Sequence, residues 1–185
     1  IVNVNARLSA REIDTIVEHS SARRVLFLAG ASPEAGAHAA RLGAASATVD
    51  GMCQLLAGAL NETAIVEDTL PGNEQVAALI YTTGTTGQSK GVMLTHRNLL
   101  FIAAVSSTLR GLSSTDRAYG VLPISHVYGL ASVALGTLYA GAALYLVPRF
   151  SVDGLLAALK DDELTIVQGV PAMYAKLLQT LGGAE

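Results

Sequence analysis

The chain has 185 residues, of which 51% are hydrophobic and 15% charged, and its formal net charge is −3. This length suits one ordinary domain, and the absence of any basic cluster argues against a nucleic-acid partner. Cys53 is the only cysteine, which excludes an internal disulfide and fits a reducing, cytoplasmic compartment.

Capping signals and apolar periodicity predict that helices and strands alternate along the chain. Ser9 and Glu12 form a capping box before the first helix, and Pro33 and Pro171 stand in the first turns of later helices. The expected helices are 10–20, 33–42, 53–60, 97–109, 129–141, 153–159 and 171–181. The expected strands are 25–28, which should be buried, and 76–81, 92–94, 119–122, 142–147 and 165–167.

The alternation predicts an α/β fold with mainly parallel sheets sandwiched by helices. In such a fold, ligands bind at the carboxyl ends of the strands. The loop 61–73, which contains Pro71 and Gly72, is the one internal boundary that the sequence indicates. We therefore expect two parts, 1–73 and 74–185.

The uncharged segment 129–147 is almost long enough to span a bilayer. However, Pro123 and His126 lie just before it, Gly141 interrupts it, and no Lys or Arg cluster flanks it. A helix followed by a short strand explains the segment better, so we expect no transmembrane span.

Residues 81–91 read YTTGTTGQSKG and follow an apolar strand. The spacing does not fit the Walker motif, because Ser89 precedes Lys90, and it does not fit the dinucleotide fingerprint either. Even so, glycines expose backbone N–H groups, threonines add hydroxyl donors, and Lys90 adds a positive charge, all of which suit a phosphate. From composition alone, a phosphate loop and a solvated connector are equally good interpretations.

This stretch closely resembles the phosphate-loop signature of the adenylate-forming superfamily, which includes acyl-CoA synthetases. The one departure is Ser89, where family members mostly carry proline. The resemblance implies that the loop binds the β- and γ-phosphates of ATP. The residues implicated are Thr82, Thr83, Gly84, Thr85, Thr86, Gly87 and Lys90.

Other stretches resemble the same family in the same order. They are 3–9, 95–99, 122–130, 147–150 and 170–174. The resemblance therefore covers nearly the whole chain. It implies that the chain is an incomplete piece of the family's large N-terminal domain, with the remaining sequence and the C-terminal domain elsewhere.

The resemblance also implies roles outside the loop. Lys90 and His126 are the implied catalytic residues, and Arg149 lies where a basic residue approaches coenzyme A. The implied substrate-binding residues are His126, Tyr128, Gly129 and Ser132. Each has a plainer alternative: a structural histidine, a core tyrosine, a small residue at a helix contact, and an arginine that solvates a strand end.

The implied reaction is ATP-dependent activation of a carboxylic acid to an acyl-adenylate, followed by thioester formation with coenzyme A. No metal ligand is expected in this chain, because no acidic residue lies between Glu74 and Asp116, so a Mg²⁺ ligand must come from elsewhere. Loading of a carrier protein, or nucleotide binding without catalysis, are the alternatives. The sequence does not determine whether the acid is aliphatic or aromatic. It also does not determine whether the full-length protein forms a homodimer.

We expect the isolated 185-residue chain to be poorly soluble, because its apolar composition suits surfaces that other segments cover. Size-exclusion chromatography and thermal melting test this. A monodisperse monomer with one cooperative transition would contradict it.

Overall fold

The computed structural model describes residues 1–28, 30–47, 55–65, 69–83 and 89–182. It contains two compact units, Ile1–Leu94 and Thr95–Glu185. The two compact units meet at residues 94 and 95. The division into 1–73 and 74–185 stays a prediction from the sequence.

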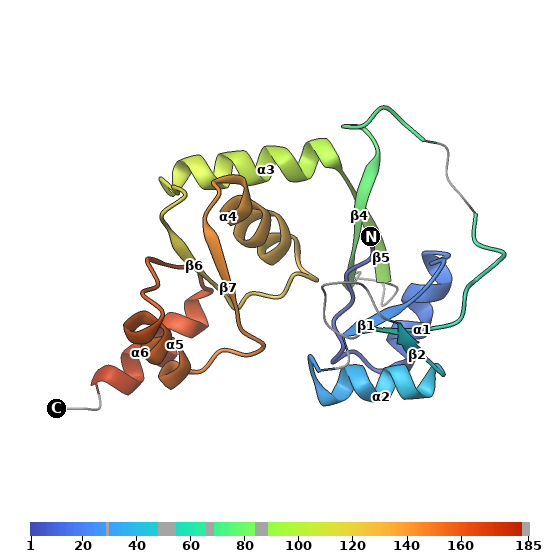
Figure 1. The fold of residues 1–185 in the computed structure, drawn as a ribbon, viewed down its shortest axis with the longest axis horizontal. Helices are drawn as coiled ribbons and strands as arrows, with labels where there is room; N and C mark the ends of the chain where they lie inside the picture. The colour runs from blue at the N-terminus through green and yellow to red at the C-terminus, as the bar shows by residue number, and fades with distance from the viewer. Residues whose placement is uncertain (29, 48–54, 66–68, 84–88, 183–185) are drawn as a thin grey trace. The chain divides into compact units, whose positions relative to one another are not determined.

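The first unit begins with two helices and a small antiparallel sheet (Figure 1). The helices are α1 (Ala10–His19) and α2 (Pro33–Arg41), and the strands are β1 (Leu26–Leu28), β2 (Ala45–Ala47) and β3 (Leu55–Ala57). The strand order is β1-β3-β2, with both pairs antiparallel. The capping box is confirmed, because the Ser9 hydroxyl accepts from the Glu12 amide and the Glu12 carboxylate accepts from the Ser9 amide.

Two expectations for this region are wrong, and its sheet is a local departure from the mainly parallel fold. A helix was expected over 53–60, but Leu55–Ala57 forms the central strand, because β1 and β2 hydrogen-bond to its two sides. A short apolar run does not distinguish a helix from a strand. The sheet is antiparallel rather than parallel. The strand at 25–28 is not buried either, since Phe27 is buried but Leu26 and Leu28 are exposed.

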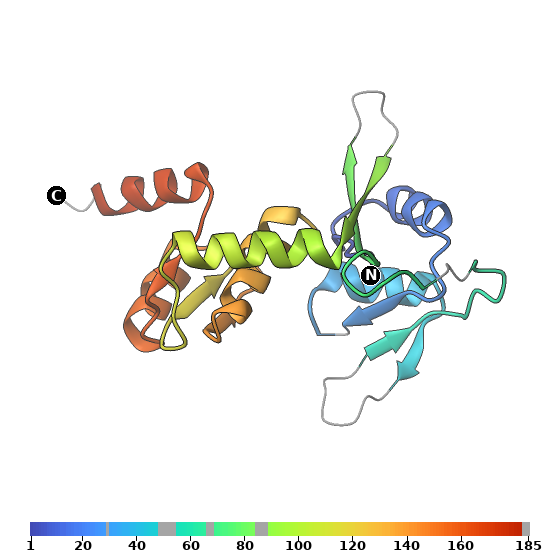
Figure 2. The same cartoon turned by 90° about the horizontal axis from the view of Figure 1, so that it is seen from above.

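The first unit ends with a two-stranded sheet of β4 (Val76–Thr83) and β5 (Ser89–Thr95), seen clearly in Figure 2. The start of the chain pairs with β4 through a parallel bridge between Val2 and Leu79. The Leu79 amide donates to the Ile1 carbonyl at 2.8 Å. Both strands are longer than expected, so they take in both ends of the predicted loop 82–91.

The second unit is a parallel sheet with helices, as the sequence predicts. The strands are β6 (Arg117–Gly120), β7 (Ala143–Leu146) and β8 (Ile166–Val167), in the order β7-β6-β8. The helices are α3 (His96–Leu109), the π-helix η1 (Tyr128–Leu135), α4 (Gly136–Tyr139), α5 (Val152–Asp161) and α6 (Pro171–Gly182). Tyr119 of the central strand is almost fully buried and packs with Leu155, Ala158 and Leu164.

The uncharged segment 129–147 divides as the sequence predicts. Gly141 follows α4 with φ +73°, a left-handed conformation that glycine adopts without strain, and β7 comes next. No helix in the described part of the chain is long and apolar enough to cross a membrane.

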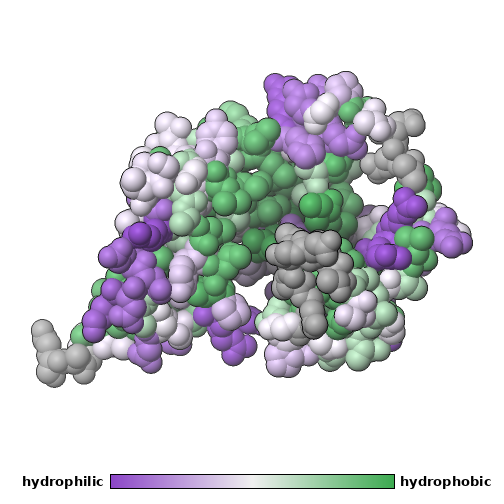
Figure 3. Space-filling model, in the orientation of Figure 1, coloured by the Kyte–Doolittle hydropathy of each residue, from purple (hydrophilic) through white to green (hydrophobic). Residues whose placement is uncertain are grey.

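Hydrophobic side chains gather on the surface over α4 and β7 (Figure 3). Leu138, Tyr139, Tyr145 and Leu146 of these elements are all exposed. This is the kind of exposed apolar surface that the composition of the chain indicated.

Asp116 connects the turn after α3 to the start of β8. Its carboxylate accepts from the amide and hydroxyl of Ser113, at 2.7 and 2.9 Å, and from the Thr165 hydroxyl at 2.8 Å. These hydrogen bonds hold the pKa of Asp116 below its ordinary value of 3.8. The Ser113 amide has the largest effect, followed by the Thr165 hydroxyl and then the Ser113 hydroxyl.

Since this pKa is lowered on folding, the carboxylate stabilises the protein above the unfolded pKa, and that contribution is lost as the pH falls through the folded pKa. We expect Asp116→Asn to destabilise the full-length protein at neutral pH, with the difference from wild type shrinking below about pH 4. Denaturant unfolding at several pH values measures this. A pH-independent difference would contradict it.

Candidate functional site

The predicted phosphate loop connects β4 to β5. Thr82 and Thr83 end β4, and Ser89 and Lys90 begin β5. Gly84, Thr85, Thr86 and Gly87 lie outside the described residues. The Lys90 side chain is exposed, and within the described ranges it forms no hydrogen bond or ion pair. An exposed ammonium group without a partner among the described residues, in a sequence stretch rich in glycine and threonine, fits the chemistry of a phosphate ligand.

Tyr81, in β4 just before the predicted loop, contacts His19 of α1. The sequence did not predict this contact. The Tyr81 hydroxyl lies 2.8 Å from Nδ1 of His19, and the two rings meet edge to face with centroids 5.7 Å apart. On the neighbouring strand, a Cβ on Gly91 would lie 3.2 Å from the Tyr81 ring, so glycine leaves room for the ring beside β5. Burial raises the pKa of Tyr81, and a hydrogen bond with Ser20 opposes the shift.

The predicted acyl segment forms a tight turn into η1. The His126 amide donates to the Pro123 carbonyl at 3.1 Å, and the His126 carbonyl accepts from Leu130 at 2.9 Å. His126 and Tyr128 are exposed, whereas Gly129 is buried. A Cβ on Gly129 would lie 2.1 Å from the Pro123 carbonyl oxygen, so this crossing requires glycine.

Ser132 is buried and anchors η1 to α3. Arg110, at the end of α3, donates to the Ser132 hydroxyl at 2.8 Å and to the Ser132 carbonyl at 3.1 Å. The Ser132 and Ser106 hydroxyls lie 2.9 Å apart. The hydroxyl of Ser132 is thus held by protein groups, and its direct contact with a substrate stays a prediction.

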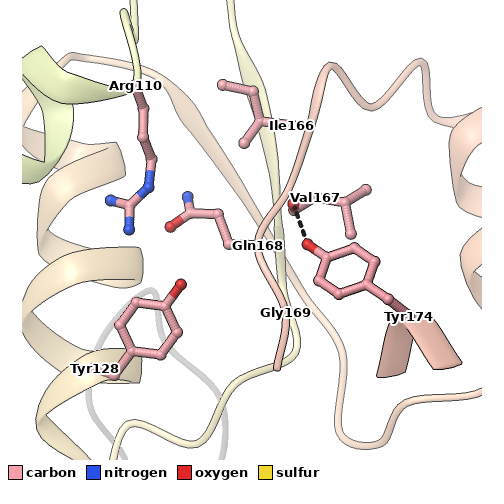
Figure 4. A pocket seen from close by; sticks show the side chains of 7 residues that line it. All are labelled: Arg110, Tyr128, Ile166, Val167, Gln168, Gly169 and Tyr174. Atoms are coloured by element: carbon pink, nitrogen blue, oxygen red, sulfur yellow. Dashed lines mark hydrogen bonds between the residues drawn. The ribbon is translucent and has the colours of Figure 1, made fainter. Parts of the chain in front are cut away.

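A pocket of about 370 Å³ lies in the second unit beside this network (Figure 4). Its lining consists of Arg110, Tyr128, Ile166, Val167, Gln168, Gly169 and Tyr174. It opens just beyond β8, at the carboxyl end of a strand in a parallel sheet, where such folds bind ligands. Tyr128 is the predicted substrate residue that lines it.

Six of the seven lining residues were not predicted as site residues, and Gln168 and Arg110 are the two whose polar groups matter most. Gln168 is a polar residue directly after β8, and its place at a strand end was a usable signal. Arg110 gave no such signal, because an arginine at a helix end is ordinary.

The other predicted site residues do not line this pocket. His126, Gly129 and Ser132 are not among its lining. Arg149 is exposed after β7, and the described residues show no hydrogen bond or ion pair to it. That leaves its guanidinium open to an anion, which fits the predicted role beside coenzyme A.

Magnesium ligands are not assembled in the part of the chain that the structure describes. No group of three or more His, Cys, Asp or Glu side chains there could hold a metal ion. A bound magnesium ion would therefore depend on phosphate oxygens or on residues other than these.

The comparisons with known proteins agree with the loop and the fold. The family model described as AMP-binding enzyme matches residues 1–185. A feruloyl-CoA synthase from Amycolatopsis sp is 33% identical over 174 residues, covering 94% of this chain and 34% of the relative. A 2-succinylbenzoate–CoA ligase from Bacillus licheniformis is 30% identical, covering 96% of this chain and 35% of the relative.

Among solved structures, ATP-bound MatB from Rhodopseudomonas palustris matches with a TM-score of 0.66 and 28% identity, covering 95% of this chain and 35% of MatB. The chain belongs to the AMP-binding enzyme family. It spans about a third of the length of these relatives.

Gly129 and Gly136 form a matched pair for testing the turn into η1. Gly129→Ala should destabilise the full-length protein by about 2 kcal/mol or more, because the new methyl group meets the Pro123 backbone. Gly136→Ala should cost much less, because its methyl group would lie 3.4 Å from Ser106, a contact that needs little adjustment. Denaturant unfolding compares them, and equal losses would contradict the assignment.

Proposed function

We propose that the whole protein activates a carboxylic acid with ATP and then transfers the acyl group to coenzyme A. In the first step the acid's carboxylate attacks the α-phosphate, and pyrophosphate leaves. In the second, the thiol of coenzyme A displaces AMP to form a thioester. The observation that carries this proposal is the phosphate-loop motif at the β4–β5 connection, in a chain that matches the AMP-binding family throughout.

The loop would stabilise the leaving pyrophosphate. Negative charge accumulates on the terminal phosphates as the bond to the α-phosphate breaks, and a positioned positive charge stabilises that transition state. Lys90 is exposed and unpaired in the described part of the chain, so its ammonium is available for this contact. Thr82, Thr83, Gly84, Thr85, Thr86 and Gly87 would supply hydroxyl and amide donors.

The pocket beside β8 would hold the acid. Its lining combines aliphatic and aromatic surface with a few polar groups, as small-molecule sites do. Tyr128 lines it directly, and Ser132 would act by holding Arg110. His126 and Gly129 belong to the turn just before η1, and we keep them as candidates for the part of the site nearest the reacting carboxylate.

Other partners follow from the same proposal. Arg149 would contact coenzyme A through its phosphates, and Mg²⁺ would be bound together with ATP. We also propose a cytoplasmic protein, as its single cysteine favours. A homodimer of the full-length protein stays an expectation for size-exclusion chromatography to check.

Loading of a carrier protein is the alternative within the same chemistry. Both reactions share the adenylation step, so the acceptor assay distinguishes them. Thioester formation with free coenzyme A supports the proposal, and transfer only to a carrier protein would replace it.

Lys90→Met should lower ATP–pyrophosphate exchange by about 100- to 1,000-fold, because the leaving group loses its counter-charge. The measurement uses the full-length protein and a panel of carboxylic acids. Lys160→Met, which removes an exposed lysine of α5, is the matched control and should leave exchange unchanged. Exchange unaffected by the Lys90 variant would refute its role, and wild-type protein inactive with every acid would refute the adenylation function.

A further inference from the structure

The pocket beside β8 carries one formal charge, and it is positive. Among its seven lining residues, only Arg110 is ionised at neutral pH. Neither ion pair in the described ranges involves Arg110; those pairs are Arg41 with Asp14 and Arg117 with Glu163. The pocket therefore presents a cation with no carboxylate beside it.

Arg110 has donors to spare. In the described part of the chain, its hydrogen bonds go to the Ser132 hydroxyl, the Ser132 carbonyl and, at 3.4 Å, the Ser106 carbonyl. A guanidinium has five N–H donors in a planar fork, so about two are left over. These bonds hold the fork in place, and Figure 4 shows it directed at the space beside Gln168.

Gln168 is the second polar group, and it is buried without a partner. Only 5% of the residue is exposed, and neither its amide nitrogen nor its amide oxygen has a hydrogen-bond partner in the described structure. A buried unsatisfied amide costs about 1–3 kcal/mol, so such a group indicates a missing ligand or solvent. Figure 4 shows its side chain reaching into the space between Arg110 and Tyr128.

We propose that Arg110 and Gln168 bind a second carboxylate on the acid, so that the preferred substrates are dicarboxylic acids. A carboxylate accepts from both arms of a guanidinium and from an amide N–H at once, and it neutralises the one charge in the pocket. This inference rests on the proposed acid-activating function, because it takes the pocket to be the acid site. It goes further in assigning the chemistry of the acid's far end.

An uncharged polar end, such as a phenol or an amide, fits the pocket less well. It would satisfy Gln168 but would leave the Arg110 charge partly desolvated without a counter-charge. A purely aliphatic end would satisfy neither group. The two residues together therefore select for negative charge rather than for polarity alone.

The test measures kcat/KM for acyl-adenylate formation by the full-length protein. The substrates are aliphatic and aromatic dicarboxylic acids, each compared with the monoamide and the monocarboxylic acid of the same shape. We expect the dicarboxylic acid to be favoured by about 100-fold, because sites built to bond a polar group discriminate strongly against analogues that lack it.

Gln168→Glu is the decisive variant. The new carboxylate would pair with the Arg110 guanidinium and would repel the second carboxylate of the substrate. We expect kcat/KM for the dicarboxylic acid to fall about 100-fold while that for the monoamide is unchanged or raised. Gln179→Glu, an exposed residue of α6 outside the pocket, makes the same charge change and should leave both values unchanged. Arg110→Met should likewise abolish the preference, with thermal melting to confirm that α3 still packs on η1.

The outcomes separate the two proposals. If the wild-type protein activates only monocarboxylic acids or monoamides, or if Gln168→Glu leaves the preference intact, the dicarboxylate inference is wrong and the acid-activating function stands. If no acid supports pyrophosphate exchange, the proposed function fails, and this inference fails with it.

Discussion

The guanidinium of Arg110 is the interaction on which the second unit's site depends. It ends α3, binds the hydroxyl and carbonyl of Ser132 on η1, and still faces the pocket beside β8. One side chain thus joins a helix contact to a binding surface. Hydrogen bonds to a charged group are stronger than neutral ones. Arg110 therefore both holds η1 in position and supplies the positive charge of the pocket.

The sequence predicted the second unit better than the first. The parallel strands β7 and β8 have clear apolar signals, and helices separate the three strands of the sheet. β6 (Arg117–Gly120) begins two residues before the predicted strand 119–122, because its sequence RAYG carries little apolar pattern. In the first unit, three-residue strands carry too little pattern to be told from a helical turn, and β3 was predicted as a helix for that reason. Its conformation is fixed by pairing with β1 and β2, which are separate from it in the sequence.

The candidate site divides in a similar way. The phosphate loop could be predicted because its candidate residues, Thr82 to Lys90, are consecutive in the sequence. The pocket could not, because Arg110, Tyr128 and Gln168 come from three separate elements that meet only in the folded unit. His19 at the base of the loop was missed for the same reason, since it lies 62 residues before Tyr81.

The π-helical form of η1 affects how the pocket can change in evolution. A π-helix closes i→i+5 hydrogen bonds and holds more residues per turn than an α-helix. Loss of a single residue from Tyr128–Leu135 would allow the segment to return to the i→i+4 bonding of an α-helix, which changes the direction of Tyr128 relative to α4. Deletion of one codon would thus change which side chain of η1 faces the pocket in place of Tyr128. The sheet β7-β6-β8 would be left unchanged.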